Sequence, residues 1–259
     1  MLALSGCNSG ATMSERGLIH VTGPDAGDFL QGLVSNDIRR APVWAAMLTP
    51  QGKYLADFFV LPWQDGLLID ADAAQAGDLM RRLSMYKLRA QVTLTPLDLA
   101  VTRGLTDAPD GAITDPRHPA LGWRAYGSGA DQAVDRDALR VAHVVPQAGV
   151  ELRPNDAFIL EYGFERLHGV DFRKGCYVGQ EVTARMHNKT ELRKGLRRVL
   201  IDGAAAIGTP VLTPDGREAG TLFTQSGGRA LAHLRFDRIS DGMIAGDARL
   251  APDPDDPSA

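Results

Sequence analysis

The chain has 259 residues, of which 44% are hydrophobic and 23% charged, an ordinary globular composition that excludes a disordered chain, a collagen and a coiled-coil rod. Its net charge of −4 argues against broad binding to a phosphate backbone, which needs an extended basic surface. Two cysteines, Cys7 and Cys176, are too few for a disulfide framework and favour a reducing compartment such as the cytoplasm. Because no run of about 18 apolar residues occurs, no membrane-spanning helix is predicted.

The first hundred residues alternate between strand and helix patterns. Pro24 suits the first turn of a helix whose apolar face carries Phe29, Leu30 and Leu33 at helical spacing. The patterns predict strands at 17–21, 43–49, 53–61, 66–71 and 91–97, a hairpin turn at 50–52, and a second helix at 73–86. This order indicates an α+β layer with helices on one face of an antiparallel sheet.

The remainder of the chain falls into two different patterns. The middle predicts strands at 98–103 and 123–126, a loop at 107–119, a helix at 135–143 and a weakly helical stretch at 149–172. Beyond Gly195, short strands are predicted at 196–201, 209–213, 217–225 and 229–236, separated by turn signals at 214–216 and 226–228. Short strands at this spacing indicate a small barrel or sandwich.

Several common catalytic motifs are missing. The six histidines show no metal-ligand spacing and there is no C-x-x-C pair, so no metal ligands are predicted. The sequence also lacks a phosphate-binding P-loop and the G-x-S-x-G elbow of hydrolases.

One segment carries unusual chemistry, the K-G-C-Y-V-G-Q-E stretch at 174–181. Gly175 and Gly179 permit tight turns or a close approach of the backbone to a ligand. Gln180 and Glu181 offer donors and acceptors that can read a flat heterocycle. Two cations, Arg173 and Lys174, lie just before Cys176, a setting that can favour its reactive thiolate form. The alternative is a glycine-rich turn around a buried cysteine that serves only packing.

This segment resembles the K-G-C-[FY]-x-G-Q-E signature of the YgfZ-type folate-binding proteins, which are relatives of the glycine-cleavage aminomethyltransferase (T-protein) and of mitochondrial iron–sulfur assembly factors. Further similarity lies at 21–26, 29–37, 48–53 and 86–89, so that the resemblance covers about residues 17–250. It implies an α+β fold of the aminomethyltransferase-like, folate-binding type, with two intertwined, ferredoxin-like α+β domains and a C-terminal β-barrel around a central channel.

The resemblance and the composition together predict the domain boundaries. We expect a disordered leader at 1–16, a first α+β domain at 17–97, a second at 98–194 that contains the signature, a β-barrel at 195–250, and a disordered tail at 251–259. The tail is rich in Pro and Asp and has no large apolar residue to bury.

The resemblance further implies a function. The YgfZ-type branch binds tetrahydrofolate and helps to assemble or repair iron–sulfur clusters in client enzymes, including a tRNA-modifying one. Its partners would be folate and iron–sulfur client or assembly proteins; a monomer is expected, without a membrane or direct nucleic-acid contact. The rival reading is a folate-dependent aminomethyl transferase, which leaves enzymatic activity open. A third reading is an interaction protein of this fold that has lost its ligand.

One departure from the T-proteins bears on this choice. T-proteins carry two adjacent acids after the first hairpin, whereas the matching segment at 55–58 has only Asp57. They also lack the K-G-C-x-x-G-Q-E signature and are about a third longer. Both points favour the YgfZ-type branch, with Asp57 as a candidate acid/base or pterin contact, or else a surface residue at a strand end.

The resulting site hypothesis assigns Cys176 and Asp57 to chemistry. Glu161 lies in an L-E-x-G segment whose Glu contacts the pterin in T-proteins, and Arg185 would pair with the anionic glutamyl tail of folate. The full set of predicted cofactor-binding residues is Asn36, Asp37, Glu161, Lys174, Gly175, Gly179, Gln180, Glu181 and Arg185. The basic residues that follow, Lys189, Arg193, Lys194, Arg197 and Arg198, are either tail contacts or a solvated face.

Overall fold

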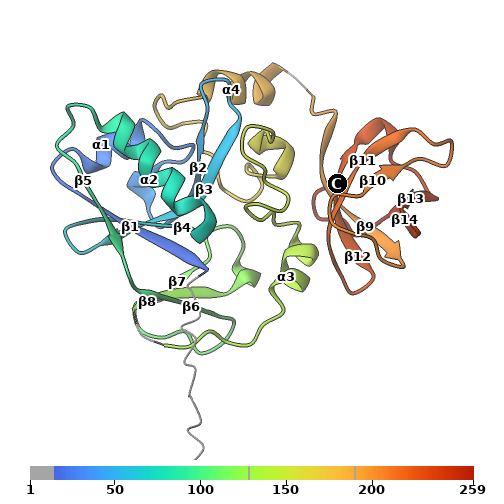
Figure 1. Cartoon of the computed structure of the whole chain (residues 1–259), viewed down its shortest axis with the longest axis horizontal. Helices are drawn as coiled ribbons and strands as arrows, with labels where there is room; N and C mark the ends of the chain where they lie inside the picture. Colours follow the sequence, from blue (N-terminus) through green and yellow to red (C-terminus); the bar gives the residue numbers. More distant parts are fainter. Residues whose placement is uncertain (1–14, 128, 190) are drawn as a thin grey trace, which may run out of the picture.

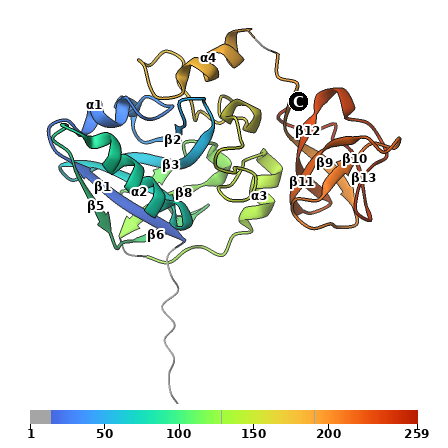
Figure 2. The same ribbon diagram turned by 45° about the horizontal axis from the view of Figure 1, so that its top comes forward.

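The computed structural model describes residues 15–127, 129–189 and 191–259, so the leader predicted at 1–16 lies almost wholly outside the described residues. Figure 1 shows a body of two sheets, with a β-barrel beside it that forms the last part of the chain. The view in Figure 2, turned by 45°, keeps the same separation between body and barrel. The fold therefore divides at the start of the barrel.

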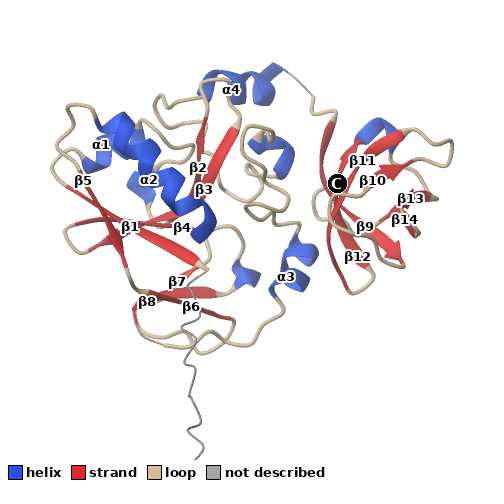
Figure 3. Ribbon diagram, in the orientation of Figure 1, coloured by secondary structure: helices blue, strands red, loops and turns tan. Residues whose placement is uncertain are grey.

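The larger sheet of the body is antiparallel, with strand order β2-β3-β4-β1-β5. Its members are β1 (Arg16–Thr22), β2 (Val43–Leu48), β3 (Tyr54–Trp63), β4 (Gly66–Asp72) and β5 (Thr93–Leu97). Two helices, α1 (Ala26–Gln31) and α2 (Ala73–Lys87), cover one face of this sheet (Figure 3). Asp72 caps α2 by accepting a hydrogen bond from the backbone N–H of Ala74, and Leu79 and Leu83 are the buried residues of this helix.

Strand β2 is buried along its whole length because each face of the sheet packs on a different core. Val43, Ala45 and Met47 belong to the core under α1 and α2. Trp44, Ala46 and Leu48 belong to the core on the opposite face, toward the middle of the molecule. This alternation follows from the period of two along a strand. Since Ala46 is paired with Asp57, Asp57 lies on the same central side of the sheet.

A second, three-stranded sheet has the order β6-β8-β7 and lies below the first in Figure 1. It consists of β6 (Ala100–Gly104), β7 (Ile113–Thr114) and β8 (Trp123–Gly127), with the 3-10 turn η2 (Pro119–Leu121) before β8. The chain then forms α3 (Arg136–His143), the 3-10 turn η3 (Ile159–Tyr162) and α4 (Gln180–Lys189). Val101 and Tyr126 of this sheet pack against Leu18, Leu61 and Leu68 of the larger one.

The last strands close into a barrel of order β10-β11-β12-β9-β14-β13. They are β9 (Lys194–Asp202), β10 (Pro210–Leu212), β11 (Glu218–Ser226), β12 (Arg229–Arg235), β13 (Met243–Ala245) and β14 (Ala248–Pro252), with the 3-10 turn η4 (Phe236–Arg238) after β12. Closure pairs β9 with both β12 and β14, and the interior is filled by small and aliphatic side chains such as Val199, Leu222 and Leu250.

Most of the predicted strands and the helices at 73–86 and 135–143 are confirmed. The prediction of a weakly helical stretch at 149–172 is wrong, because this stretch consists mostly of turns around η3. Helix α4 and strands β13 and β14 were not predicted, and the predicted loop at 107–119 contains the short strand β7, which pairs with β8. The segment at 251–259 differs from a disordered tail: β14 extends to Pro252, and the buried Asp253 accepts hydrogen bonds from Arg198 and Arg229. Ion pairing, which apolar content does not reveal, orders this end.

Candidate functional site

A cavity of about 550 Å³ lies between the two sheets and α3. Its wall on the larger sheet includes Asp57 and Phe59, and its wall on the smaller sheet includes Arg103 and Arg124. Ligand sites of small molecules typically enclose about 300–1,000 Å³. The cavity is therefore large enough for a small organic cofactor. Its lining comes from the α+β body alone, whereas the resemblance implied a channel that the barrel also surrounds.

Asp57 sits at the wall of this cavity and is only 9% exposed. The indole N–H of Trp44 donates to its Oδ2 at 2.8 Å, and the hydroxyl of Tyr54 donates to its Oδ1 at 2.6 Å. Burial, with the carboxylate of Asp57 next to it, raises the pKa of Tyr54 far above its ordinary value, so the hydroxyl keeps its proton. Asp57 is thus a positioned acceptor, and not a surface residue at a strand end.

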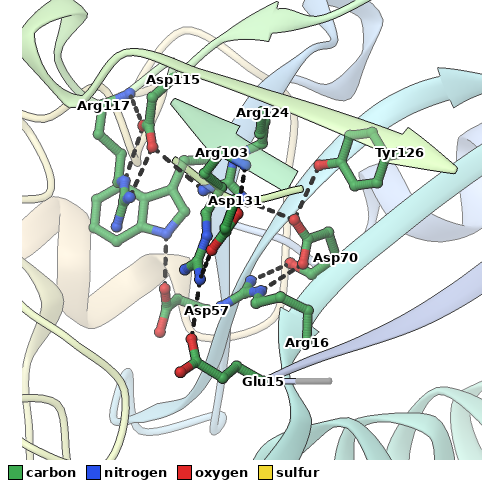
Figure 4. A network of polar contacts seen from close by, with 11 residues as sticks. Glu15, Arg16, Asp57, Asp70, Arg103, Asp115, Arg117, Arg124, Tyr126 and Asp131 are labelled. Atoms are coloured by element: carbon green, nitrogen blue, oxygen red, sulfur yellow. Dashed lines mark hydrogen bonds and ion pairs between the residues drawn. The ribbon is translucent and has the colours of Figure 1, made fainter. Parts of the chain in front are cut away.

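A chain of buried ion pairs runs beside Asp57 (Figure 4). Asp70 accepts from Arg16 at 2.6 Å, from Arg124 at 2.5 Å and from the hydroxyl of Tyr126 at 2.9 Å. Arg124 continues to Asp115 at 3.3 Å and also lies 3.6 Å from the ring centre of Phe59. These contacts join β1, β3, β4 and β8 into one rigid cavity wall.

The carboxyl groups in this chain are held ionised by their partners. Burial opposes the ionisation of Asp70, but the guanidinium groups of Arg16 and Arg124 more than offset it and hold its pKa below the usual range. For Asp115, burial is likewise outweighed by Arg117 and Arg124, which lower its pKa. The wall therefore consists of charge pairs and not of free charges.

The rim of the cavity brings two guanidinium groups together around one carboxylate. Arg103 and Arg136 both approach Asp131, at 3.0 and 3.3 Å, and Arg103 also pairs with Glu15 at 3.0 Å. Burial, followed by repulsion from Arg103, lowers the pKa of Arg136. An anionic group at this rim would relieve that repulsion.

The signature segment lies away from this cavity, between α1 and α4. Lys174 is buried, and its ammonium donates to the backbone carbonyls of Gln31, at 2.7 Å, and Val34. Burial lowers the pKa of Lys174 to about 8. Lys174 therefore anchors the segment to the first α+β layer.

Cys176 is an exposed free thiol. The following residue, Tyr177, is buried, and Gly179 has a φ of +85° and brings its backbone close to Thr49 in the first hairpin. A side chain at Gly179 would meet the Thr49 carbonyl at 2.5 Å, so only glycine allows this contact. The thiol is thus displayed on a turn that is fixed at both ends, which contradicts the alternative of a buried packing cysteine.

The other predicted cofactor contacts are occupied with structural tasks. Asn36 donates both amide hydrogens, to the carbonyls of Trp44 at 2.7 Å and His168 at 2.6 Å. Asp37 caps the 3-10 turn η1 (Ile38–Arg40) and accepts from Gln31 at 2.9 Å. Glu161 lies 3.2 Å from His233 and 3.5 Å from Lys194, where the body meets the barrel.

Residues at the start of α4 face outward. Arg185 pairs with Glu181 at 2.8 Å, and both side chains are exposed. Gln180 lines a shallow hollow together with Pro50, Tyr86 and Tyr177, whereas Gly175 is exposed, and a Cβ added there would meet no atom within 4 Å. Arg198, from the basic stretch, is buried against Asp253. Among the predicted site residues, Asp57 alone lines the central cavity, and the contacts of the others with folate stay predictions.

Sequence reasoning missed the arginines of the cavity wall. Arg16, Arg103, Arg117 and Arg124 come from separate segments that only the sheets bring together. No local motif surrounds them, and the only signal is the presence of an arginine in an otherwise apolar strand pattern, as at Arg124 in β8.

In the described ranges, no group of three or more His, Cys, Asp or Glu side chains is placed to hold a metal ion. Nor does any helix of the described residues have the length and apolar character needed to cross a membrane.

Comparisons with known proteins relate this chain to a family by sequence and to a known fold by structure. Residues 193–257 match the family profile described as CAF17, C-terminal beta-barrel domain. The chain is similar to the human protein named iron-sulfur cluster assembly factor IBA57, mitochondrial, with 30% identity over 272 residues, covering 86% of this chain and 76% of the human protein. A Pyricularia oryzae homologue of that factor is 32% identical, with 92% of this chain and 75% of the relative covered.

A Mycosarcoma maydis homologue is 34% identical over 71% of this chain, and the chain spans 55% of that relative's length. Among solved structures, the glycine cleavage system aminomethyltransferase T from Bartonella henselae superposes with a TM-score of 0.70, at 12% identity, covering 93% of this chain and 84% of that one. This likeness confirms the predicted fold, an aminomethyltransferase-like α+β arrangement with a C-terminal barrel of six strands.

Proposed function

The chain belongs to the IBA57 family of iron–sulfur cluster assembly factors, and we propose that it assists the assembly or repair of iron–sulfur clusters through the exposed thiol of Cys176. Thiolates are the ordinary ligands of such clusters. One cysteine leaves the other coordination positions to a partner, so the cluster is cargo shared between two proteins. The exposed thiol must stay reduced for this role, which favours a reducing compartment such as the cytoplasm.

The observation that carries this proposal is the presentation of Cys176. Its neighbours Lys174 and Tyr177 are buried, while the thiol between them is exposed. A packing residue would lie inward, and a residue on a loose loop would not have a buried anchor on each side. The arrangement supports a thiol that meets another molecule in a defined orientation.

A complementation experiment tests this role. In a deletion strain we expect Cys176→Ser and Cys176→Ala to fold normally, yet to leave iron–sulfur enzyme activity and thiolated tRNA at the deletion level. Cys7→Ser is the matched control, because it removes the other cysteine of the chain. Full complementation by Cys176→Ala would sink the proposal, since the thiol would then be dispensable.

We further propose that the central cavity binds tetrahydrofolate, a group whose ring nitrogens carry one-carbon units when it is bound. The residues fit it: each oxygen of Asp57 accepts only one hydrogen bond and retains capacity for pterin N–H donors. The guanidinium pair Arg103 and Arg136 suits the carboxylates of the glutamyl tail. The Nε of Arg124, buried in the wall without a hydrogen-bond partner, is a further donor.

Thermal unfolding in the presence of tetrahydrofolate tests this second part. A ligand that binds only the folded state adds roughly 2.7 kcal/mol at 100 times its Kd. We expect a rise in Tm for the wild-type protein and an equal rise for Cys176→Ala, because the thiol lies outside the cavity lining. An unchanged Tm at saturating ligand would remove the cofactor from the proposal but leave the role of Cys176.

The alternative function is a folate-dependent aminomethyl transfer, favoured by the placement of Asp57 in the cavity wall. Turnover with methylene-tetrahydrofolate, ammonia and an aminomethyl-lipoyl carrier would establish it. We expect none, because Asp57 already accepts hydrogen bonds from Trp44 and Tyr54 and has no second acid beside it, Ala56 being its neighbour.

A further inference from the structure

Three large apolar side chains are exposed at the end of α2. Met85 is 54% exposed, Tyr86 39% and Leu88 88%. Leu88, directly after the helix, has φ 41° and ψ −103°, a backbone conformation that disfavours a residue with a Cβ. The side chain of Leu88 is exposed and adds nothing to the core, and its backbone conformation is strained. The stability of the fold therefore does not explain why a leucine stands here.

One of these side chains, that of Tyr86, borders the segment that displays Cys176. Tyr86 lines a shallow hollow together with Pro50, Tyr177 and Ala184. Tyr177 follows Cys176 directly in the chain, so the hollow adjoins the segment that carries the thiol. We call the surface formed by Pro50, Met85, Tyr86, Leu88, Tyr177 and Ala184 the α2–α4 patch.

Unpaired cations flank this patch. Arg89 follows Leu88, and Arg173 lies three residues before Cys176; both are exposed, and neither forms an ion pair with a described residue. Arg185, in contrast, is already paired with Glu181. A cluster held by several thiolates carries net negative charge, so the surface around it suits two free guanidinium groups.

We propose that the α2–α4 patch is the docking surface for the protein that brings or receives the cluster, an acidic iron–sulfur protein whose apolar contact area adjoins its cysteine ligands. Leu88 is the apolar anchor of this interface, and Arg89 and Arg173 pair with carboxylates around it. Tyr177 of the patch is the chain neighbour of Cys176, so a protein seated on the patch lies close to the thiol, and this sets the occupant. This inference rests on the proposed function and names its partner surface.

Photo-crosslinking in cells tests it. Benzoylphenylalanine is placed at Leu88 of the full chain and, as a matched control, at Ile207, which is 56% exposed on the barrel side of the molecule. We expect an adduct at position 88 with an acidic protein that contains a cysteine-ligated cluster, at a yield about tenfold above that at position 207. An adduct with a second copy of this chain, or equal yields at the two positions, overturns the proposal.

Single substitutions distinguish a failure of the docking surface from a failure of the proposed thiol function. Leu88→Asp should retain the wild-type Tm, because the side chain is already exposed, and should lower complementation of iron–sulfur enzymes about tenfold, whereas Ile207→Asp should have no effect. If Cys176→Ala fails to complement but Leu88→Asp complements fully, the docking surface is wrong and the thiol role stands. If Cys176→Ala complements, the proposed function itself fails.

Discussion

Lys174 and Cys176 are separated by one residue, yet the ammonium of Lys174 is buried against the carbonyls of Gln31 and Val34 while the thiol of Cys176 is exposed. The lysine of the signature is therefore an anchor, and the cysteine is the group presented to other molecules. This division predicts that the two residues respond to different measurements, stability for the lysine and complementation for the cysteine.

The buried lysine makes stability depend on alkaline pH. Burial lowers the pKa of Lys174 from 10.5 to about 8, so between these values the unfolded chain binds more protons than the folded one, and stability rises with pH. We expect the unfolding free energy of the wild type relative to Lys174→Met to increase from pH 8 to about pH 10. Urea unfolding of both proteins measures it, with Lys87→Met as a control; parallel pH profiles for wild type and Lys174→Met would contradict the prediction.

The ion pairs of the cavity wall make stability depend on pH in the acid range. Asp70 and Asp115 have pKa values below the ordinary 3.8, so their contribution is complete above that pH and is lost as the pH falls below it. Asp115→Asn leaves Arg117 and Arg124 without this partner and should cost about 3–5 kcal/mol at neutral pH. Its stability should also fall less steeply in acid than that of the wild type, and equal slopes in urea unfolding below pH 4 would argue against this account.

We predict that Asp57 contributes both to the stability of the protein and to ligand binding in the cavity. In Asp57→Asn the amide nitrogen faces either Trp44 or Tyr54, both of them donors, which should cost about 1–3 kcal/mol. We also expect a smaller rise in Tm with tetrahydrofolate than in the wild type. Asp241→Asn, an exposed change in a turn of the barrel, is the control for loss of a negative charge. An unaltered response to the ligand in Asp57→Asn would exclude this carboxylate from the binding site.

We predict that alanine substitution destabilises the protein at one glycine of the signature and not at the other. Gly179→Ala places a Cβ 2.5 Å from the Thr49 carbonyl, at a φ of +85°, and should destabilise the protein by about 1–3 kcal/mol. Gly175→Ala meets no atom within 4 Å and should be tolerated. Thermal unfolding and complementation of both variants decide the matter, and equal losses for the two would mean that the close approach of α4 to the first hairpin is not what Gly179 provides.

Local patterns determined the secondary structure wherever periodicity was strong. The hairpin at 43–61, the helix at 73–86 and the short strands of the barrel follow from alternation, turn residues and an apolar helix face. Helix α4 escaped this reasoning because Gln180–Lys189 is short and polar, and it is held by contacts of Gly179 and Val182 with the hairpin turn. The order at 251–259 depends on Asp253 meeting Arg198 beside the pairing of β14 with β9, a contact between residues far apart in the chain.

The sequence by itself determined which segment was unusual, and its eight-residue signature pointed to the family and the fold that the comparisons bear out. Only the tertiary structure separated that segment from the cavity. Asp57 reached the cavity because the strand period of two set it on the central face of β3, while its neighbours from the other sheet, Arg103 and Arg124, came from strands more than 40 residues away in the chain. Which charges meet across two sheets is set by strand pairing and layer packing, and no local pattern encodes those contacts.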